Sequence, residues 1–254
     1  MKRVAFTVSI SLAAFIAAAA LTRSGVLRQR ETVPYFGSNG WTLKRNIILT
    51  PTSSEPRIVG RDVLYFAADG RCRQVTYRLG DDGTEICETV SVWIPGRGAF
   101  HEMSRDQQLV YVSDYEGFGG DIDVRLARKD PNYVSDQQIL GYNCALTRIV
   151  NPDGTASEYY EGYNFSRYPL KVISRNHEAI KAWEPTAIEI GEVPESALVH
   201  RSEWPVDFSH FEKKLQRMQS ANPSDPLYAQ QAQRMHQQVE QAKQRLSAQG
   251  YRIK

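Results

Sequence analysis

The sequence predicts an α+β fold that is mainly β: a curved antiparallel sheet (half-barrel) with a long C-terminal α-helix and an N-terminal apolar helix. Three observations favour it. Short segments rich in Val, Ile, Tyr and Thr, separated by glycine turns, run from 61 to 205. Several of these segments are apolar on both faces. From 206 to 254 the hydrophobic period changes to that of helices. The 254 residues are 41% hydrophobic and 24% charged, which is typical of an ordinary globular protein.

Residues 1–24 form a separate segment. A start with two cations precedes the apolar run 4–21, and Ala18 to Ala20 offer small residues for cleavage, as in an export signal. The run is also about as long as the minimum of roughly 17 residues that spans a bilayer, so an uncleaved membrane anchor is the alternative. The cations would keep the N-terminus in the cytoplasm. Both readings predict an exported body, either periplasmic or anchored in the inner membrane and facing the periplasm.

The predicted strands follow one another closely. Residues 25–60 are expected to be a linker that leads into a first strand at 41–50, before the β domain of 61–205. The further strands are predicted at 62–67, 73–79, 85–94, 108–113, 141–150, 155–160, 169–174 and 186–193. Glycines that follow aspartates at 70, 83 and 154 mark the tight turns between them. Residues 141–160 are therefore expected to form a β-hairpin.

Apolar side chains occupy both faces of some strands. In 62–67, Val63 and Tyr65 alternate with Leu64 and Phe66, whereas a strand with one wet face alternates apolar with polar. We expect either a cover on both sides of the sheet or a curved sheet around an apolar interior. The many aromatic residues near the strands either fill a core or line a cavity for an apolar ligand. The candidate cavity residues are Tyr65, Tyr111, Tyr142, Leu146, Leu170 and Ile188.

Export makes disulfides feasible, and the chain has three cysteines, Cys72, Cys87 and Cys144. A simple hairpin turn at 80–83 would place Cys87 opposite Thr76, four residues from Cys72. That offset is about 13 Å at roughly 3.3 Å per residue, whereas bridged Cα atoms lie within about 7 Å. A bridge between Cys72 and Cys87 would need a bulged or different turn. The alternative is that the cysteines are small buried hydrophobic residues.

The C-terminal region, 206–254, is predicted to be helical. Phe208, Phe211 and Leu215 recur at intervals of three and four, and Pro226 suits the first position of a second helix that ends before Gly250. The second helix carries an apolar stripe about three heptads long. The stripe packs against the protein's own sheet or pairs with another helix. The candidate interface residues are Met235, Val239 and Leu246.

The sequence shows no catalytic constellation. His101 and Glu102 start like a zinc-protease motif, but Arg105 stands where the second histidine ligand belongs. The five histidines have no ligand spacing, and no nucleophile elbow, phosphate loop or dinucleotide fingerprint is present. We therefore expect no metal, no cofactor and no enzymatic activity. The 31 basic and 29 acidic residues are spread along the chain, which argues against nucleic-acid binding.

Motifs in the second half of the chain occur in a recognisable order. Residues 139–144 (ILGYNC) precede a strand, an Asp-Gly turn, a Tyr-rich strand and the run 168–171 (YPLK), and a Pro-x-Ser-x-Leu segment follows at 194–198. This order resembles exported bacterial proteins with the lipoprotein-localisation (LolA/LolB-like) half-barrel, over about 61–205. The chain departs from that pattern in its long C-terminal helix, in its N-terminal segment if that segment is an uncleaved anchor, and in the lack of a lid helix between the early strands.

The resemblance implies a strongly curved antiparallel sheet around an apolar cavity that helices partly cover. Well-understood members carry the acyl chains of lipoproteins or lipids across the periplasm, and many relatives have no assigned activity. We therefore expect an exported, non-enzymatic protein that binds a lipid or a lipoprotein acyl chain. The alternative is a scaffold protein, anchored in the membrane through 4–21 if the leader is uncleaved, whose C-terminal helix docks a protein partner.

Overall fold

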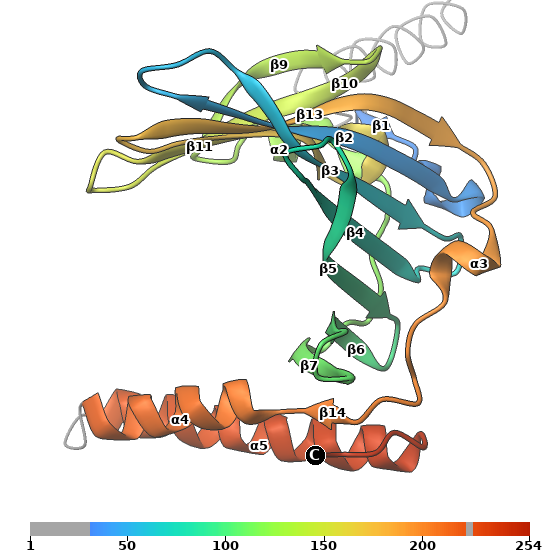
Figure 1. Cartoon of the computed structure of the whole chain (residues 1–254), viewed down its shortest axis with the longest axis vertical. Helices are drawn as coiled ribbons and strands as arrows, with labels where there is room; N and C mark the ends of the chain where they lie inside the picture. The colour runs from blue at the N-terminus through green and yellow to red at the C-terminus, as the bar shows by residue number, and fades with distance from the viewer. Residues whose placement is uncertain (1–30, 222–225) are drawn as a thin grey trace, which may run out of the picture.

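The computed structural model describes residues 31–221 and 226–254. Its main feature is one long, bent sheet with a pair of C-terminal helices at one end (Figure 1). The strands of this sheet are β2 (Trp41–Pro51), β3 (Arg57–Phe66), β4 (Cys72–Leu79), β5 (Glu85–Ile94), β6 (Gly98–Met103), β7 (Gln108–Ser113), β9 (Tyr133–Ile139), β10 (Tyr142–Val150), β11 (Ala156–Gly162), β12 (Tyr168–Arg175), β13 (Ala179–Ile190) and β14 (Val206–Asp207). A two-stranded ribbon joins β1 (Thr32–Val33) to β8 (Ile122–Asp123).

The helices are short except at the C-terminus. They are η1 (Phe36–Asn39), α2 (Val124–Ala127), η2 (Tyr163–Phe165), α3 (Glu195–Leu198), α4 (Ser209–Ala221) and α5 (Pro226–Ala248). None of the helices found among the described residues has the length and apolar content needed to cross a membrane. The predicted leader or anchor, 1–24, and the start of the predicted linker lie outside the described residues.

The strand order is β14-β7-β6-β5-β4-β3-β2-β13-β12-β11-β10-β9. Two antiparallel meanders thus meet where β2 pairs with β13, and only the short contact between β14 and β7 is parallel. The two ends of this order are not paired with each other, so the sheet bends without closing into a barrel (Figure 1). The predicted class, a curved antiparallel sheet with a long C-terminal helix, is confirmed. The boundary predicted at residue 61, between the linker segment and the β domain, falls inside β3. The first strand of that linker segment, β2, is a central strand of the same sheet.

Most predicted strands are present, and the predicted 141–160 hairpin is formed by β10 and β11. Several stretches were not predicted as strands: β6, β9, the first halves of β3 and β13, and the two-residue strands β1, β8 and β14. β9 is an edge strand with largely exposed polar residues, so it lacks the apolar signal of a buried strand. In β13, Pro185 interrupts the pattern, and the sheet accommodates it at a register shift between Pro185 and Ala187.

The sheet has two apolar faces. Trp41, Phe66, Cys72 and Trp93 stand side by side in one row across β2 to β5, and we call this side the aromatic face. The other side, which we call the helix face, carries the cluster that includes Val75, Val92, Phe100 and Tyr111. The helix face is covered by α4 and α5, while Tyr35, Phe36 and Phe118 from loops and turns pack on the aromatic face. Both faces are therefore covered over β4 and β5, which is one of the two arrangements that the two-sided apolar strands predicted.

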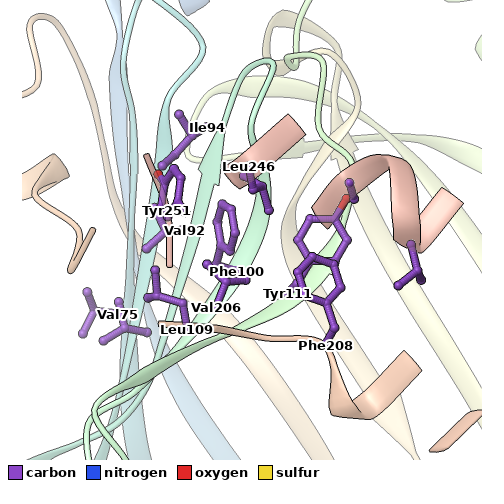
Figure 2. Packing of buried hydrophobic residues seen from close by; sticks show 13 residues of the cluster. Val75, Val92, Ile94, Phe100, Leu109, Tyr111, Val206, Phe208, Leu246 and Tyr251 are labelled. Carbon is purple, nitrogen blue, oxygen red and sulfur yellow. The ribbon is translucent and has the colours of Figure 1, made fainter. Parts of the chain in front are cut away.

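The apolar stripe of α5 packs on the protein's own sheet. Val239, Ala242 and Leu246 are buried in the cluster of the helix face. Figure 2 shows Leu246 beside Phe100, and Tyr111 next to Phe208. The rings of Tyr111 and Phe208 are stacked with centroids 4.6 Å apart. Burying a large apolar side chain contributes about 1.5–3 kcal/mol, so this stripe anchors the C-terminal helices to the domain.

All three cysteines are free; Cys72 and Cys144 are buried, as the alternative of small buried hydrophobic residues predicted, whereas Cys87 is exposed. The detailed register differs from the expected one. The loop between β4 and β5 spans Gly80 to Thr84, so Leu79 pairs with Glu85 and Cys87 lies opposite Tyr77 instead of Thr76. A bulge beyond this pair then places Thr76 opposite Thr89. Cys72 pairs with Trp93, far from Cys87 along the strand. The extra loop residue and the bulge shift the pairing without bringing the two thiols together.

Candidate functional site

A cavity of about 140 Å³ lies on the aromatic face. Its wall is formed by Leu64, Phe66, Cys72, Trp93, Tyr115, Phe118 and Tyr168. The first four come from β3, β4 and β5, where neighbouring strands align their side chains. Tyr168 reaches the cavity from β12, and Tyr115 and Phe118 come from the loop that connects β7 to β8. Segments that are far apart in sequence therefore build this wall.

The loop of 114–121 crosses the aromatic face and carries two cavity residues. Its path depends on glycine: at Gly119, where φ is +132°, a Cβ atom would lie 2.2 Å from the ring of Tyr35. The Tyr115 hydroxyl donates a hydrogen bond of 2.9 Å to the Gly70 carbonyl, and the Tyr115 carbonyl accepts one of 2.8 Å from the Gly96 amide. These bonds fix the loop to the turns that follow β3 and β5.

Phe118 closes the cavity from the loop side. Its ring meets Phe66 edge to face at 5.5 Å and Tyr168 at 6.0 Å between centroids. Below it, Phe66 stacks on Trp41 at 5.3 Å. Such ring pairs contribute roughly 0.5–1.5 kcal/mol each beyond area burial. The aromatic contacts therefore hold Phe118 in place while it remains only partly buried.

The cavity wall is electrically neutral. Burial raises the pKa of the Tyr168 hydroxyl to about 12 and raises the pKa of the Cys72 thiol well above its usual range. Burial also raises the pKa of Tyr115. All three groups thus keep their protons at physiological pH, and the remaining wall residues carry no titratable group. The site can bind apolar groups, but its protonated tyrosine and cysteine side chains do not act as a base, a nucleophile or a metal ligand.

A buried ion pair between Arg45 on β2 and Asp62 on β3, the strand that also carries Leu64, stands next to the cavity. Arg45 donates to both carboxylate oxygens of Asp62, at 2.9 and 2.6 Å, and the Gln74 amide donates to the same carboxylate at 2.7 Å. A third guanidinium bond of 3.0 Å reaches the Pro169 carbonyl. The group ties β2, β3, β4 and β12 together beside the apolar wall.

The structure distributes the six residues predicted to line a cavity over several places. Tyr142, Leu170 and Ile188 belong to the aromatic-face cluster that surrounds the cavity, although the wall itself is made by other residues. Tyr111 lies in the core of the helix face. Tyr65 packs near Val193 and Leu198 in a small separate cluster. Leu146 is buried on β10.

The predicted helix-interface residues lie at the junction of α5 with the sheet. Val239 and Leu246 are buried there. Met235 and Val239 also line a groove of about 330 Å³ between β7, α4 and α5, together with Tyr111 and Phe211. The stripe is thus used within the chain, and only Met235 remains partly exposed toward the groove.

None of the seven wall residues is among the six that the sequence predicted to line a cavity. Phe118 stands in a glycine-rich segment, 117–120, which reads as an ordinary loop. The available signal for Phe118 was an apolar aromatic residue between two glycines. Such a side chain is unusual in a fully solvated loop and indicates that the loop packs on another part of the protein. Among the described residues, no group of three or more His, Cys, Asp or Glu side chains could hold a metal ion.

Comparison with known proteins gives structural neighbours only. No protein-family model and no curated protein sequence matches the chain. The similar solved structures include a LolA superfamily protein from Nitrosomonas europaea (8% identity, 65% of this chain and 92% of that chain, TM-score 0.33), MucB in complex with MucA(peri) (16%, 65% and 55%, TM-score 0.38) and an outer membrane lipoprotein-sorting protein domain from Vibrio parahaemolyticus (10%, 60% and 85%, TM-score 0.26).

The LolA superfamily, which the sequence resembles, is thus represented among the structural neighbours of the chain. Because all three TM-scores are below 0.5, the ligands and partners of these proteins are not transferred to it.

Proposed function

We propose that this chain is an exported, non-enzymatic binding protein that holds an apolar group of a lipid or a lipoprotein acyl chain in the cavity of the aromatic face. The observation that supports the proposal is the cavity itself, whose wall is apolar and whose titratable groups stay neutral. The leader-like segment 1–24 supports export. The absence of charged groups from the wall favours binding over catalysis.

The expected driving force is hydrophobic. Each buried methylene contributes about 0.8 kcal/mol, which corresponds to roughly fourfold in affinity. Edge-to-face contacts with Phe66, Phe118 and Tyr168 would add to the affinity.

A cavity-filling variant tests the proposal. Cys72→Met adds apolar atoms to the cavity wall, and Cys87→Met places the same side chain at an exposed position as the matched control. We expect the full-length Cys72→Met protein to bind a fluorescent fatty acid at least about tenfold more weakly than the wild type, because at least two methylenes' worth of space is lost. Titration of probe fluorescence gives the Kd of each protein.

Every full-length variant contains the apolar segment 4–21, so any binding of the probe to this segment is the same in all of them. A difference between the variants therefore reports on the cavity. We expect Cys87→Met to bind like the wild type, and both variants to keep the wild-type circular dichroism spectrum. Equal probe affinities of a folded Cys72→Met protein and the wild type would contradict a role for this cavity. A wild-type Kd well above roughly 100 μM would count against any carrier function.

A further inference from the structure

The size of the cavity restricts what it can hold. Its volume is about 140 Å³, whereas pockets that enclose a drug-sized ligand measure about 300–1,000 Å³. An apolar cavity of about 150 Å³ accommodates benzene. A long acyl chain therefore exceeds the space that is bounded by Phe66, Trp93 and Phe118, and only a part of such a ligand fits inside.

The wall also favours a particular shape of guest. Five of the seven lining residues are aromatic: Phe66, Trp93, Tyr115, Phe118 and Tyr168. The rings of Phe66 and Tyr168 both stand edge to face to Phe118. A guest ring between them can form the same offset or edge-to-face contacts, which an alkyl chain cannot form. These contacts would favour a ring over an alkyl group of equal area by roughly twofold to tenfold.

We propose that the cavity is a subsite for a single ring-sized apolar group, preferably an aromatic ring, while the rest of the ligand stays outside it. The proposal rests on the proposed function, in which the cavity binds an apolar group, and makes a ring the preferred group in place of an acyl chain. The ring can belong to a peptide side chain or to a small amphiphile, and both present the same chemistry to the wall.

Competition against the fluorescent probe tests the size limit. The full-length protein is titrated with straight-chain carboxylates from butanoate to dodecanoate. We expect the affinity to rise about fourfold per methylene for the shortest members and then to stay constant once the cavity is full. A continuous rise to dodecanoate would overturn the ring-sized subsite and would leave the proposed function intact. Failure of every carboxylate to displace the probe would contradict the proposed function itself.

A second comparison tests the preference for a ring. Nonanoate and 3-phenylpropionate have the same number of carbon atoms, and hydrophobicity alone predicts that the longer, fully saturated nonanoate binds more tightly. We expect 3-phenylpropionate to bind severalfold more tightly, because its ring fits inside while the outer methylenes of nonanoate gain nothing. The opposite order would overturn the preference. Competition by N-acetyl-phenylalanine amide at similar concentration would assign the ring to a peptide, and its failure would assign the ring to a non-peptide amphiphile.

Phe118→Ala provides the matched variant, because Phe118 is partly buried on a loop and closes the cavity from one side. Removing its ring should enlarge the cavity, so the affinity plateau should move to longer carboxylates and the advantage of 3-phenylpropionate should shrink. Phe118→Leu serves as a milder replacement if the alanine variant unfolds. A plateau that stays at the same chain length in a folded variant would contradict the role of Phe118 as a wall of the subsite.

Discussion

Arg45 and Asp62 illustrate how single residues support the bent sheet. Both side chains are almost fully buried, and the guanidinium bonds to both oxygens of the carboxylate. Burial disfavours the charged guanidinium, but the hydrogen bonds and the charge of Asp62 outweigh this and raise the pKa of Arg45. Gln74 and the Pro169 carbonyl satisfy further hydrogen-bonding groups of the pair. The charges of the pair are therefore balanced and hydrogen-bonded. Removing either partner would leave an uncompensated charge buried in the protein.

We expect Arg45→Met to lower the free energy of unfolding by about 3–5 kcal/mol, because it leaves the Asp62 carboxylate buried without its counter-charge. The double variant Arg45→Met, Asp62→Leu should recover a large part of this loss. Urea unfolding monitored by circular dichroism gives both values. A double variant that is less stable than the single one would show that the pair itself, and not the orphaned charge, is what matters.

The C-terminal helix is an element for which the sequence left two roles open and the structure shows one. Its apolar stripe predicted either packing on the protein's own sheet or pairing with another helix, and the residues Val239, Ala242 and Leu246 lie in the core of the helix face. Salt bridges support the same docking: Arg245 pairs with Asp114, and Lys243 pairs with Glu212 of α4. The helix is thus an integral part of the domain.

Leu246→Ala tests this integration, because Leu246 is fully buried between α5 and the sheet. The loss of its side chain should lower the free energy of unfolding by about 2–5 kcal/mol. Gln244→Ala, two residues away on the exposed side, should change it by less than about 0.5 kcal/mol. The two proteins are compared by chemical denaturation. Equal stabilities would mean that α5 contributes little to the core and is free to dock elsewhere.

At the scale of the whole molecule, the C-terminal segment is joined by a polar contact to the segment that follows α3, in addition to its packing in the core. The ring of His200 lies 2.9 Å from the Tyr251 hydroxyl and faces Arg97, which approaches the same ring of Tyr251. Burial and the nearby charge of Arg97 lower the pKa of His200 from its ordinary value of 6.5. Burial also lowers the pKa of His101 on β6.

These shifts predict a loss of stability in acid. As the pH falls below 6.5, the unfolded chain takes up a proton on His200 before the folded chain does, so protonation favours unfolding. The stability that is present above pH 6.5 is therefore lost as the pH falls through the lower pKa that His200 has in the folded chain. We expect His200→Gln to reduce the drop in Tm between neutral and mildly acidic pH. His236→Gln, at an exposed position, is the control and should leave the pH profile unchanged. An equal drop in all three proteins would exclude His200 as a cause.

The sequence by itself determined the local elements. Asp-Gly turns, β-branched strands and the apolar stripe of α5 encode their own conformation through backbone preferences and side-chain periodicity, so the meander, the 141–160 hairpin and the C-terminal helices were predictable. It also predicted that strands such as β3 would have either a cover on both faces or a place in a curved sheet around an apolar interior. The residues that line the cavity were not predictable in this way.

Only the tertiary structure decided which apolar residues share a site. Bulges near Tyr77 and Pro185 shift the register, and a shift of one residue moves a side chain to the opposite face. The loop of 114–121 carries Tyr115 and Phe118 across the sheet to Cys72 and Tyr168, residues that no local pattern connects with it. Contacts between distant segments depend on the pairing and path of the whole chain, and a single strand or turn does not contain that information.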